Sequence, residues 1–140
     1  MPLLVKANLS THIYAEITDI ITRTDDTIVT KAIANAESEA KSYLNRFDIV
    51  AMFVTTNPDE WLKSLVKDLA CWHLIKLANP NINLELFRTS YEDAKKYFKD
   101  VMLGNVEPAD WPLRADDPAT TFDESGHISS SSNTKRTNHY

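Results

Sequence analysis

The fold is decided by the stretch from residue 57 to residue 77, which reads NPDEWLKSLVKDLACWHLIKL. Asn57 is suited to cap a helix, Pro58 to occupy its first position, and Glu60 to complete the pattern three residues after the cap. The second half is apolar on nearly every side, and only two polar residues interrupt it. A helix of this kind is normally buried at the centre of a protein or covered by a partner. We therefore predict a central helix that ends at Asn79-Pro80.

Two helices are predicted before it. The first runs from about Thr11 to Thr22, with Ser10 or Thr11 as its cap. Its apolar face consists of Ile13, Ile17, Ile20 and Ile21. The second runs from about Thr27 to Arg46 and follows the capping sequence Asp25-Asp26-Thr27. Its narrow apolar stripe consists of Val29, Ile33, Ala36, Ala40, Tyr43 and Phe47.

A fourth helix is predicted from about Leu84 to Leu103, with Asn83 as its cap and Gly104 placed to end it. Its apolar stripe consists of Leu84, Phe87, Tyr91, Ala94, Phe98 and Val101. The expected fold class is therefore all-α: a small four-helix bundle followed by a long extended C-terminal tail. We expect a helical core over residues 1–104 that carries the fold alone, and a tail over residues 105–140.

Composition excludes several classes of protein. The chain has 140 residues but only two glycines, so no glycine-rich phosphate-binding loop is available. Its net charge of −5 provides no general attraction for nucleic acid or an anionic membrane. Cys71 is the only cysteine, which excludes an intrachain disulfide and a cysteine metal cluster.

The link between the second and third helices is unusually apolar for a loop. Its apolar residues are Phe47, Ile49, Val50, Met52, Phe53 and Val54. One interpretation is that this link folds back over the core or extends the second helix. The other is that it forms an exposed apolar lip that packs on another subunit.

The tail has a composition that is unusual for a linker, because it contains the aromatic residues Trp111, Phe122 and Tyr140. Prolines punctuate its first part and disfavour regular elements there. A basic, polar segment closes it at residues 133–140. We expect an extended chain whose large side chains anchor it on a partner.

We find no pattern that indicates catalysis, a cofactor or a metal. Cys71 and His73 are two residues apart on one helix and point in different directions, so we interpret them as a core cysteine and a packed or hydrogen-bonded histidine. His12, His127 and His139 lie in separate regions without a partner motif. We therefore expect no catalytic, cofactor-binding or metal-binding residues, and no enzymatic activity.

Several stretches, in this order along the chain, resemble a known family. They are residues 17–23 (ITDIITR), 32–36 (AIANA), 40–48 (AKSYLNRFD), 68–74 (DLACWHL), 91–97 (YEDAKKY) and 132–140 (SNTKRTNHY). The chain resembles the head-to-tail connector proteins of tailed bacteriophages, also called adaptor or head-completion proteins, and in particular their Mu-like prophage branch.

This resemblance implies a structural role in the virion. Such proteins form a ring of about twelve copies beneath the portal, a cyclic assembly that bridges capsid and tail. The implied partners are the portal protein, neighbouring copies of the chain, a downstream neck or tail-completion protein, and genomic DNA that passes through the channel without sequence-specific binding. The implied location is the virion neck, after assembly in the host cytoplasm. The alternative is a host helical scaffolding or regulatory module that self-associates.

The apolar link and the tail supply the expected protein-interface residues. They are Phe47, Ile49, Phe53, Trp111, Phe122, Ile128, Lys135, Arg136, His139 and Tyr140.

Overall fold

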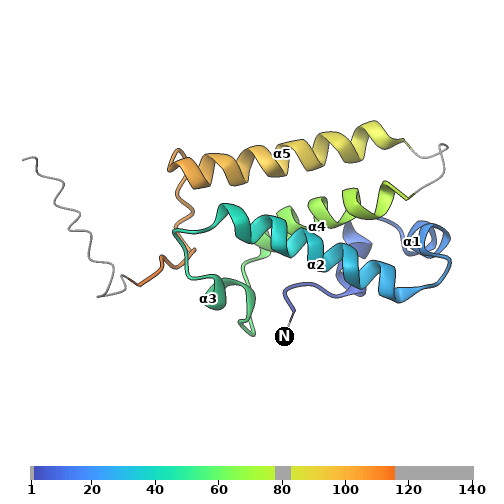
Figure 1. Ribbon diagram of the computed structural model, residues 1–140, viewed down its shortest axis with the longest axis horizontal. Coiled ribbons are helices and arrows are strands. Elements are labelled where there is room, and N and C mark those ends of the chain that lie inside the picture. The colour runs from blue at the N-terminus through green and yellow to red at the C-terminus, as the bar shows by residue number, and fades with distance from the viewer. Residues whose placement is uncertain (1, 78–82, 116–140) are drawn as a thin grey trace, which may run out of the picture.

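The computed structural model describes residues 2–77 and 83–115, whose regular elements are helices joined by loops (Figure 1). They are the 3-10 helix η1 (Lys6–Thr11) and the α-helices α1 (Ala15–Thr22), α2 (Asp26–Tyr43), α3 (Ile49–Phe53), α4 (Glu60–Ile75) and α5 (Leu84–Leu103). These residues contain no strand, and one isolated antiparallel bridge joins Phe47 to Leu113. The predicted all-α class is confirmed.

Helix α4 lies at the centre, as its sequence predicts. It packs mainly against α2 and α5, and it also contacts α1 and η1. Its predicted cap is wrong: Asp59, not Asn57, caps the helix, and its carboxylate accepts a hydrogen bond from the Leu62 amide at 2.8 Å. The helix ends at Ile75, earlier than predicted, and Asn79-Pro80 lies outside the described residues.

Helices α2 and α5 cover the central helix with the stripes that the sequence predicts. On α2, the fully buried Ala36 and Ala40 leave room for a close approach of α4, because an alanine side chain is a single methyl group. On α5, Phe98 is fully buried and stacks on Tyr43 of α2 with ring centroids 6.1 Å apart. Gly104 ends α5 with φ of +77°, a left-handed conformation that glycine adopts without steric cost.

The first predicted helix differs most from the structure. The chain forms η1, turns at His12 to Tyr14, and only then begins α1, so neither Ser10 nor Thr11 caps that helix. Ile20 is 75% exposed, and the buried side chains of α1 are Thr18 and Thr22. Each threonine hydroxyl donates to the carbonyl four residues earlier, which satisfies the polar group and allows its burial.

The apolar link folds back over the core, as one of the two interpretations predicts, but it forms a separate helix and does not extend α2. Asp48 caps the short helix α3, and its carboxylate accepts a hydrogen bond from the Ala51 amide. Met52 and Phe53 are buried, whereas Val50 and Val54 are 68% and 58% exposed. The link therefore contributes to the core and also presents apolar side chains to solvent.

The first part of the predicted tail is packed against the helices. The Asp48 amide donates to the carbonyl of Pro112, and the Arg114 amide donates to the carbonyl of Arg46, both at 2.9 Å. Trp111 is only 5% exposed and makes an edge contact with Phe47. Trp111 is therefore part of the core, although most of the residues around it are exposed. The division into a core over residues 1–104 and a tail over residues 105–140 stays a prediction.

Replacing Trp111 with alanine should lower the free energy of unfolding by about 3–5 kcal/mol, the usual cost of deleting a buried tryptophan. Trp61 supplies a matched control, because it is 50% exposed and its replacement by alanine removes less buried side-chain volume. Urea denaturation of both variants measures the difference. Equal losses for Trp111→Ala and Trp61→Ala would contradict the packing of Trp111 in the core.

Candidate interaction surface and polar clusters

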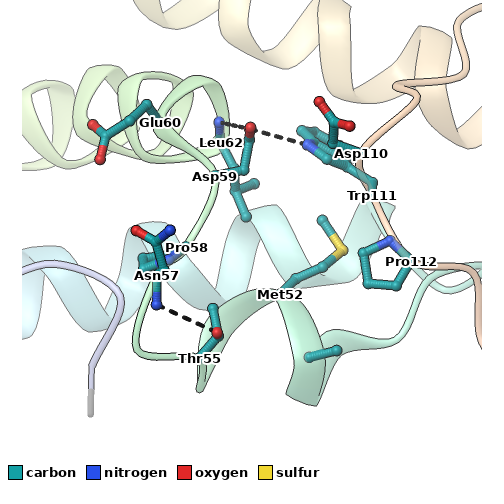
Figure 2. Close-up of a pocket in the computed structure, with 11 residues that line it drawn as sticks. Met52, Thr55, Asn57, Pro58, Asp59, Glu60, Leu62, Asp110, Trp111 and Pro112 are labelled. Carbon is teal, nitrogen blue, oxygen red and sulfur yellow. Dashed lines mark hydrogen bonds between the residues drawn. The ribbon is translucent and has the colours of Figure 1, made fainter.

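A cavity of about 600 Å³ opens between the link that precedes α4 and the segment that follows α5 (Figure 2). Met52, Leu62 and Trp111 contribute apolar wall, and Asp59 and Asp110 contribute carboxylates. The remaining lining residues are Ala51, Thr55, Asn57, Pro58, Glu60 and Pro112. The cavity thus combines apolar walls with acidic groups, and none of the residues that line it is basic.

One carboxylate oxygen holds the two sides of this cavity together. Asp59 Oδ1 accepts the Leu62 amide at 2.8 Å and the indole Nε1–H of Trp111 at 3.1 Å. Figure 2 shows both hydrogen bonds converging on Asp59. Hydrogen bonds to an ionised group are stronger than those between neutral groups. Asp59 therefore connects the start of the central helix to the segment after α5.

The structure divides the expected interface residues into three groups. Phe47, Phe53 and Trp111 are buried inside the chain's own core, and Ile49 is partly buried against that core. The four are therefore not freely available to a partner on this surface. The third group lies outside the described residues and consists of Phe122, Ile128, Lys135, Arg136, His139 and Tyr140.

Exposed apolar residues also occur on segments that lie at the two ends of the long axis of the molecule (Figure 1), while others, among them Val5 and Trp61, belong to other segments. We call one of these two ends the α3 end; its exposed residues are Val50, Val54, Leu103 and Leu113. We call the other the α1 end; its exposed residues are Ile20, Leu77 and Leu86. One of the two interpretations of the apolar link predicts the exposure of Val50 and Val54, whereas the predicted apolar face of the first helix wrongly includes Ile20.

A second feature that sequence reasoning missed is a polar cluster between η1 and α4. His12 Nε2 lies 3.3 Å from Ser64 Oγ and 3.6 Å from Asp68 Oδ1, and its Nδ1 lies 2.8 Å from Thr11 Oγ1. Lys67 donates to the same threonine hydroxyl at 3.2 Å. Ser64 and Asp68 both approach Nε2, whereas a catalytic triad places its carboxylate on the other ring nitrogen. This geometry does not activate Ser64 as a nucleophile.

The comparisons with known proteins identify the family. The sequence model of the family described as bacteriophage Mu, Gp36 matches residues 6–126.

The chain belongs to the bacteriophage Mu Gp36 family.

The matched range includes both η1 and the segment after α5, the two parts whose positions the sequence alone did not predict. No curated protein sequence and no solved structure matches the chain significantly.

A polar network joins the three long helices of this Gp36-family protein. Glu39 of α2 binds His73 Nε2 at 3.0 Å through one carboxylate oxygen and accepts from the Tyr91 hydroxyl at 2.9 Å through the other. Tyr91 also stacks on Trp72. The interpretation of His73 as a hydrogen-bonded histidine is confirmed. Its partner Glu39 is partly buried.

Burial controls the ionisation of the groups around His12. It raises the pKa of Asp68 to about 6, with a further contribution from Asp93. Burial, together with the charge of Lys67, lowers the pKa of His12. Both pKa shifts favour the uncharged forms, which are the protonated carboxyl of Asp68 and the unprotonated imidazole of His12. Nearby, burial raises the pKa of the Cys71 thiol to about 12, and Cys71 is 2% exposed, so its interpretation as a core residue is confirmed.

A membrane span or a metal centre would need features that residues 2–77 and 83–115 do not contain. No helix in these ranges is both long and apolar enough to cross a membrane. Nor do these ranges contain a group of three or more His, Cys, Asp or Glu side chains placed to hold a metal ion.

The raised pKa of Asp68 predicts how the Asp68→Asn variant responds to pH. The folded chain binds the Asp68 proton more tightly than the unfolded chain, so the wild type loses stability as pH rises from about 4 through 6. Asparagine has no proton to lose. Relative to the wild type, the free energy of unfolding of the variant should therefore rise by on the order of 1–3 kcal/mol between pH 4 and pH 8.

Urea denaturation of both proteins at pH 4, 6 and 8 measures this gain. The exposed Glu85 of α5 provides the control, because Glu85→Gln removes the same charge from a solvated position. If the difference in free energy of unfolding between Asp68→Asn and the wild type stays constant with pH, the pKa of Asp68 is not raised in the folded chain.

Proposed function

We propose that this chain is a structural virion protein: a head-to-tail connector that forms a ring beneath the portal, bridges capsid to tail and lines the DNA channel. Membership of the Mu Gp36 family supports a structural or morphogenetic role in a bacteriophage. It also favours this proposal over a host scaffolding module. The proposed location is the neck of the virion.

The observation that carries the proposal is that exposed apolar residues occur on elements at both ends of the bundle, on α3 at one end and on α1 and the start of α5 at the other (Figure 1). A protein that bridges two partners needs two contact surfaces, and a ring of identical copies also needs two different surfaces that fit each other. Two exposed apolar residues at each end are suited to such contacts: Val50 and Val54 at the α3 end, and Ile20 and Leu86 at the α1 end. Burying them in an interface removes apolar surface from contact with water, which is favourable.

The proposed orientation follows from the segment after α5. Hydrogen bonds from Asp48 and Arg114 hold this segment at the α3 end, so the chain beyond residue 115 starts there. We propose that the α3 end faces the portal and that the tail docks on the portal or on a neighbouring copy. The α1 end is then available to a neighbouring copy or to a downstream neck or tail-completion protein.

Catalysis has no part in this proposal. The nearest approach to a catalytic arrangement in the described residues is the His12 cluster, whose geometry does not match a serine nucleophile with its base. The polar network of Glu39, His73 and Tyr91 holds three helices together. We therefore propose that the protein acts by assembly and not as an enzyme.

The proposed orientation predicts that the two ends respond differently to substitution. The double substitution Val50→Ser and Val54→Ser should weaken binding to the purified portal protein of the same phage by about tenfold or more, because two apolar contacts are lost. The matched control is Ile20→Ser and Leu86→Ser at the α1 end, which should leave portal binding unchanged. Analytical ultracentrifugation of the mixtures measures both affinities, and melting curves check that each variant is folded.

Full portal affinity in the α3-end variant, or an equal loss in both variants, would contradict the proposed orientation. The connector function would be contradicted if the wild-type chain does not bind the portal at all, whether the portal is monomeric or assembled as a ring.

The connector function also predicts weak interaction with DNA. A channel lining must let the genome pass, and a chain with a net charge of −5 attracts no phosphate backbone overall. Fluorescence anisotropy with a labelled duplex at physiological salt should show no binding at micromolar protein. Binding in that range that weakens steeply with added salt would indicate a nucleic-acid-binding protein instead.

A further inference from the structure

The acidic cavity at the α3 end has the properties of a site for a basic polypeptide segment. It has apolar walls, from Met52 and Trp111 among others, and its volume of about 600 Å³ is enough for several side chains. Three carboxylates line it, from Asp59, Glu60 and Asp110. A groove with apolar walls and acidic groups at its edge suits a segment that carries positive charge and some apolar or aromatic surface.

The carboxylates of the cavity differ in how far they are already neutralised. Glu60 pairs with Lys63 at 2.6 Å, so much of its charge is balanced on the surface. Asp59 uses Oδ1 for its two hydrogen bonds, and neither donor is a cation that would balance a carboxylate charge. Asp110 is exposed on the opposite wall. Asp59 and Asp110 therefore give the cavity a negative potential that an incoming cation can satisfy.

One segment of this chain has the complementary chemistry. Residues 133–140 read NTKRTNHY and contain Lys135 and Arg136, one aromatic residue and no acidic residue. The stretch between Ala115 and this segment contains Asp116, Asp117, Asp123 and Glu124, which the cavity repels. Of the chain beyond residue 115, the segment 133–140 is therefore the part whose charge fits the cavity.

The connection is long enough for the same chain to make this contact. Pro112 lines the cavity, and residues 113–132 separate it from the segment. A chain of that length spans at most about 70 Å when fully extended, so its length does not keep the segment from the cavity. At such a tether length the effective concentration of the segment at the cavity is on the order of millimolar. A weak charge-based contact is therefore sufficient to keep the site occupied.

We propose that residues 133–140 bind in the acidic cavity of their own chain, with Lys135 and Arg136 directed at Asp59 and Asp110. In the unassembled protein this contact occupies the basic segment, and a partner must displace it to bind either the segment or the cavity. The proposal does not depend on the connector function, because it concerns a contact within one free chain.

The test measures this contact in the full-length protein by paramagnetic broadening of NMR signals. A nitroxide attached at Ser131→Cys provides the probe, and Cys71 does not compete for the label, because it is buried and its thiol pKa is raised to about 12. At 50 mM NaCl the label should broaden the amide signals of Thr55, Asn57 and Asp110. At 500 mM NaCl the broadening should disappear, because salt screens an exposed charge contact.

Matched variants show whether charge causes the contact. Lys135→Ala with Arg136→Ala should abolish most of the broadening, and Asp110→Asn, which removes one of the two proposed partner carboxylates, should weaken it. The control, Glu16→Gln with Glu85→Gln, removes two exposed carboxylates outside the cavity and should leave the broadening intact. An absence of broadening in the wild type, or the same broadening in both charge-neutralised variants, would overturn the proposal.

A mixed sample identifies which chain supplies the segment. When isotope-labelled chains without the nitroxide are mixed with spin-labelled chains at natural isotope abundance, no broadening should appear, because the contact is intramolecular. Broadening that appears only in this mixture would overturn the proposal in favour of contact between copies. Failure to bind a portal would leave all of these results unchanged, so the test is independent of the proposed function.

Discussion

The hydrogen bonds accepted by Asp59 connect the parts of the structure on which function depends. A single oxygen caps the central helix α4 and also holds the indole of Trp111. Trp111 in turn packs against Phe47, which precedes α3. The start of the central helix, the apolar link and the segment after α5 are thus joined at one corner of the bundle. Because this corner is fixed, the acidic cavity is formed and the chain beyond residue 115 always starts from the same end.

This arrangement makes the two ends of the bundle chemically different. The α3 end combines exposed apolar residues, an acidic cavity and the start of the tail, whereas the α1 end presents apolar residues on α1, after α4 and on α5. Between them, the polar network of Glu39, His73 and Tyr91 joins α2, α4 and α5. The middle of the molecule is therefore rigidly connected, and the surfaces suited to other proteins lie at its ends. Such a division suits a protein that holds two larger structures together.

Much of the fold follows from local patterns in the sequence. The apolar stripes of α2 and α5 and the apolar character of α4 predict which faces are buried, because helical spacing alone sets them. The positions that differ depend on contacts between distant residues. Asp59 caps α4 and also accepts a hydrogen bond from Trp111, 52 residues further along the chain, and Pro112 and Arg114 form backbone hydrogen bonds with residues 48 and 46. His12 meets Ser64 and Asp68 only because η1 crosses α4. No local spacing signals such encounters, so the candidate surface was less predictable than the fold.

An electron cryomicroscopy reconstruction of the neck of the intact phage tests the central claim most directly. The account predicts copies of this chain between portal and tail, arranged in a ring, with the end of the bundle that carries α3 and residues 105–115 (Figure 1) facing the portal. It also predicts that the α1 end contacts a neighbouring copy or the next protein of the neck. A reconstruction in which this chain is absent from the neck, or in which the α3 end faces solvent while the α1 end contacts the portal, would contradict the account.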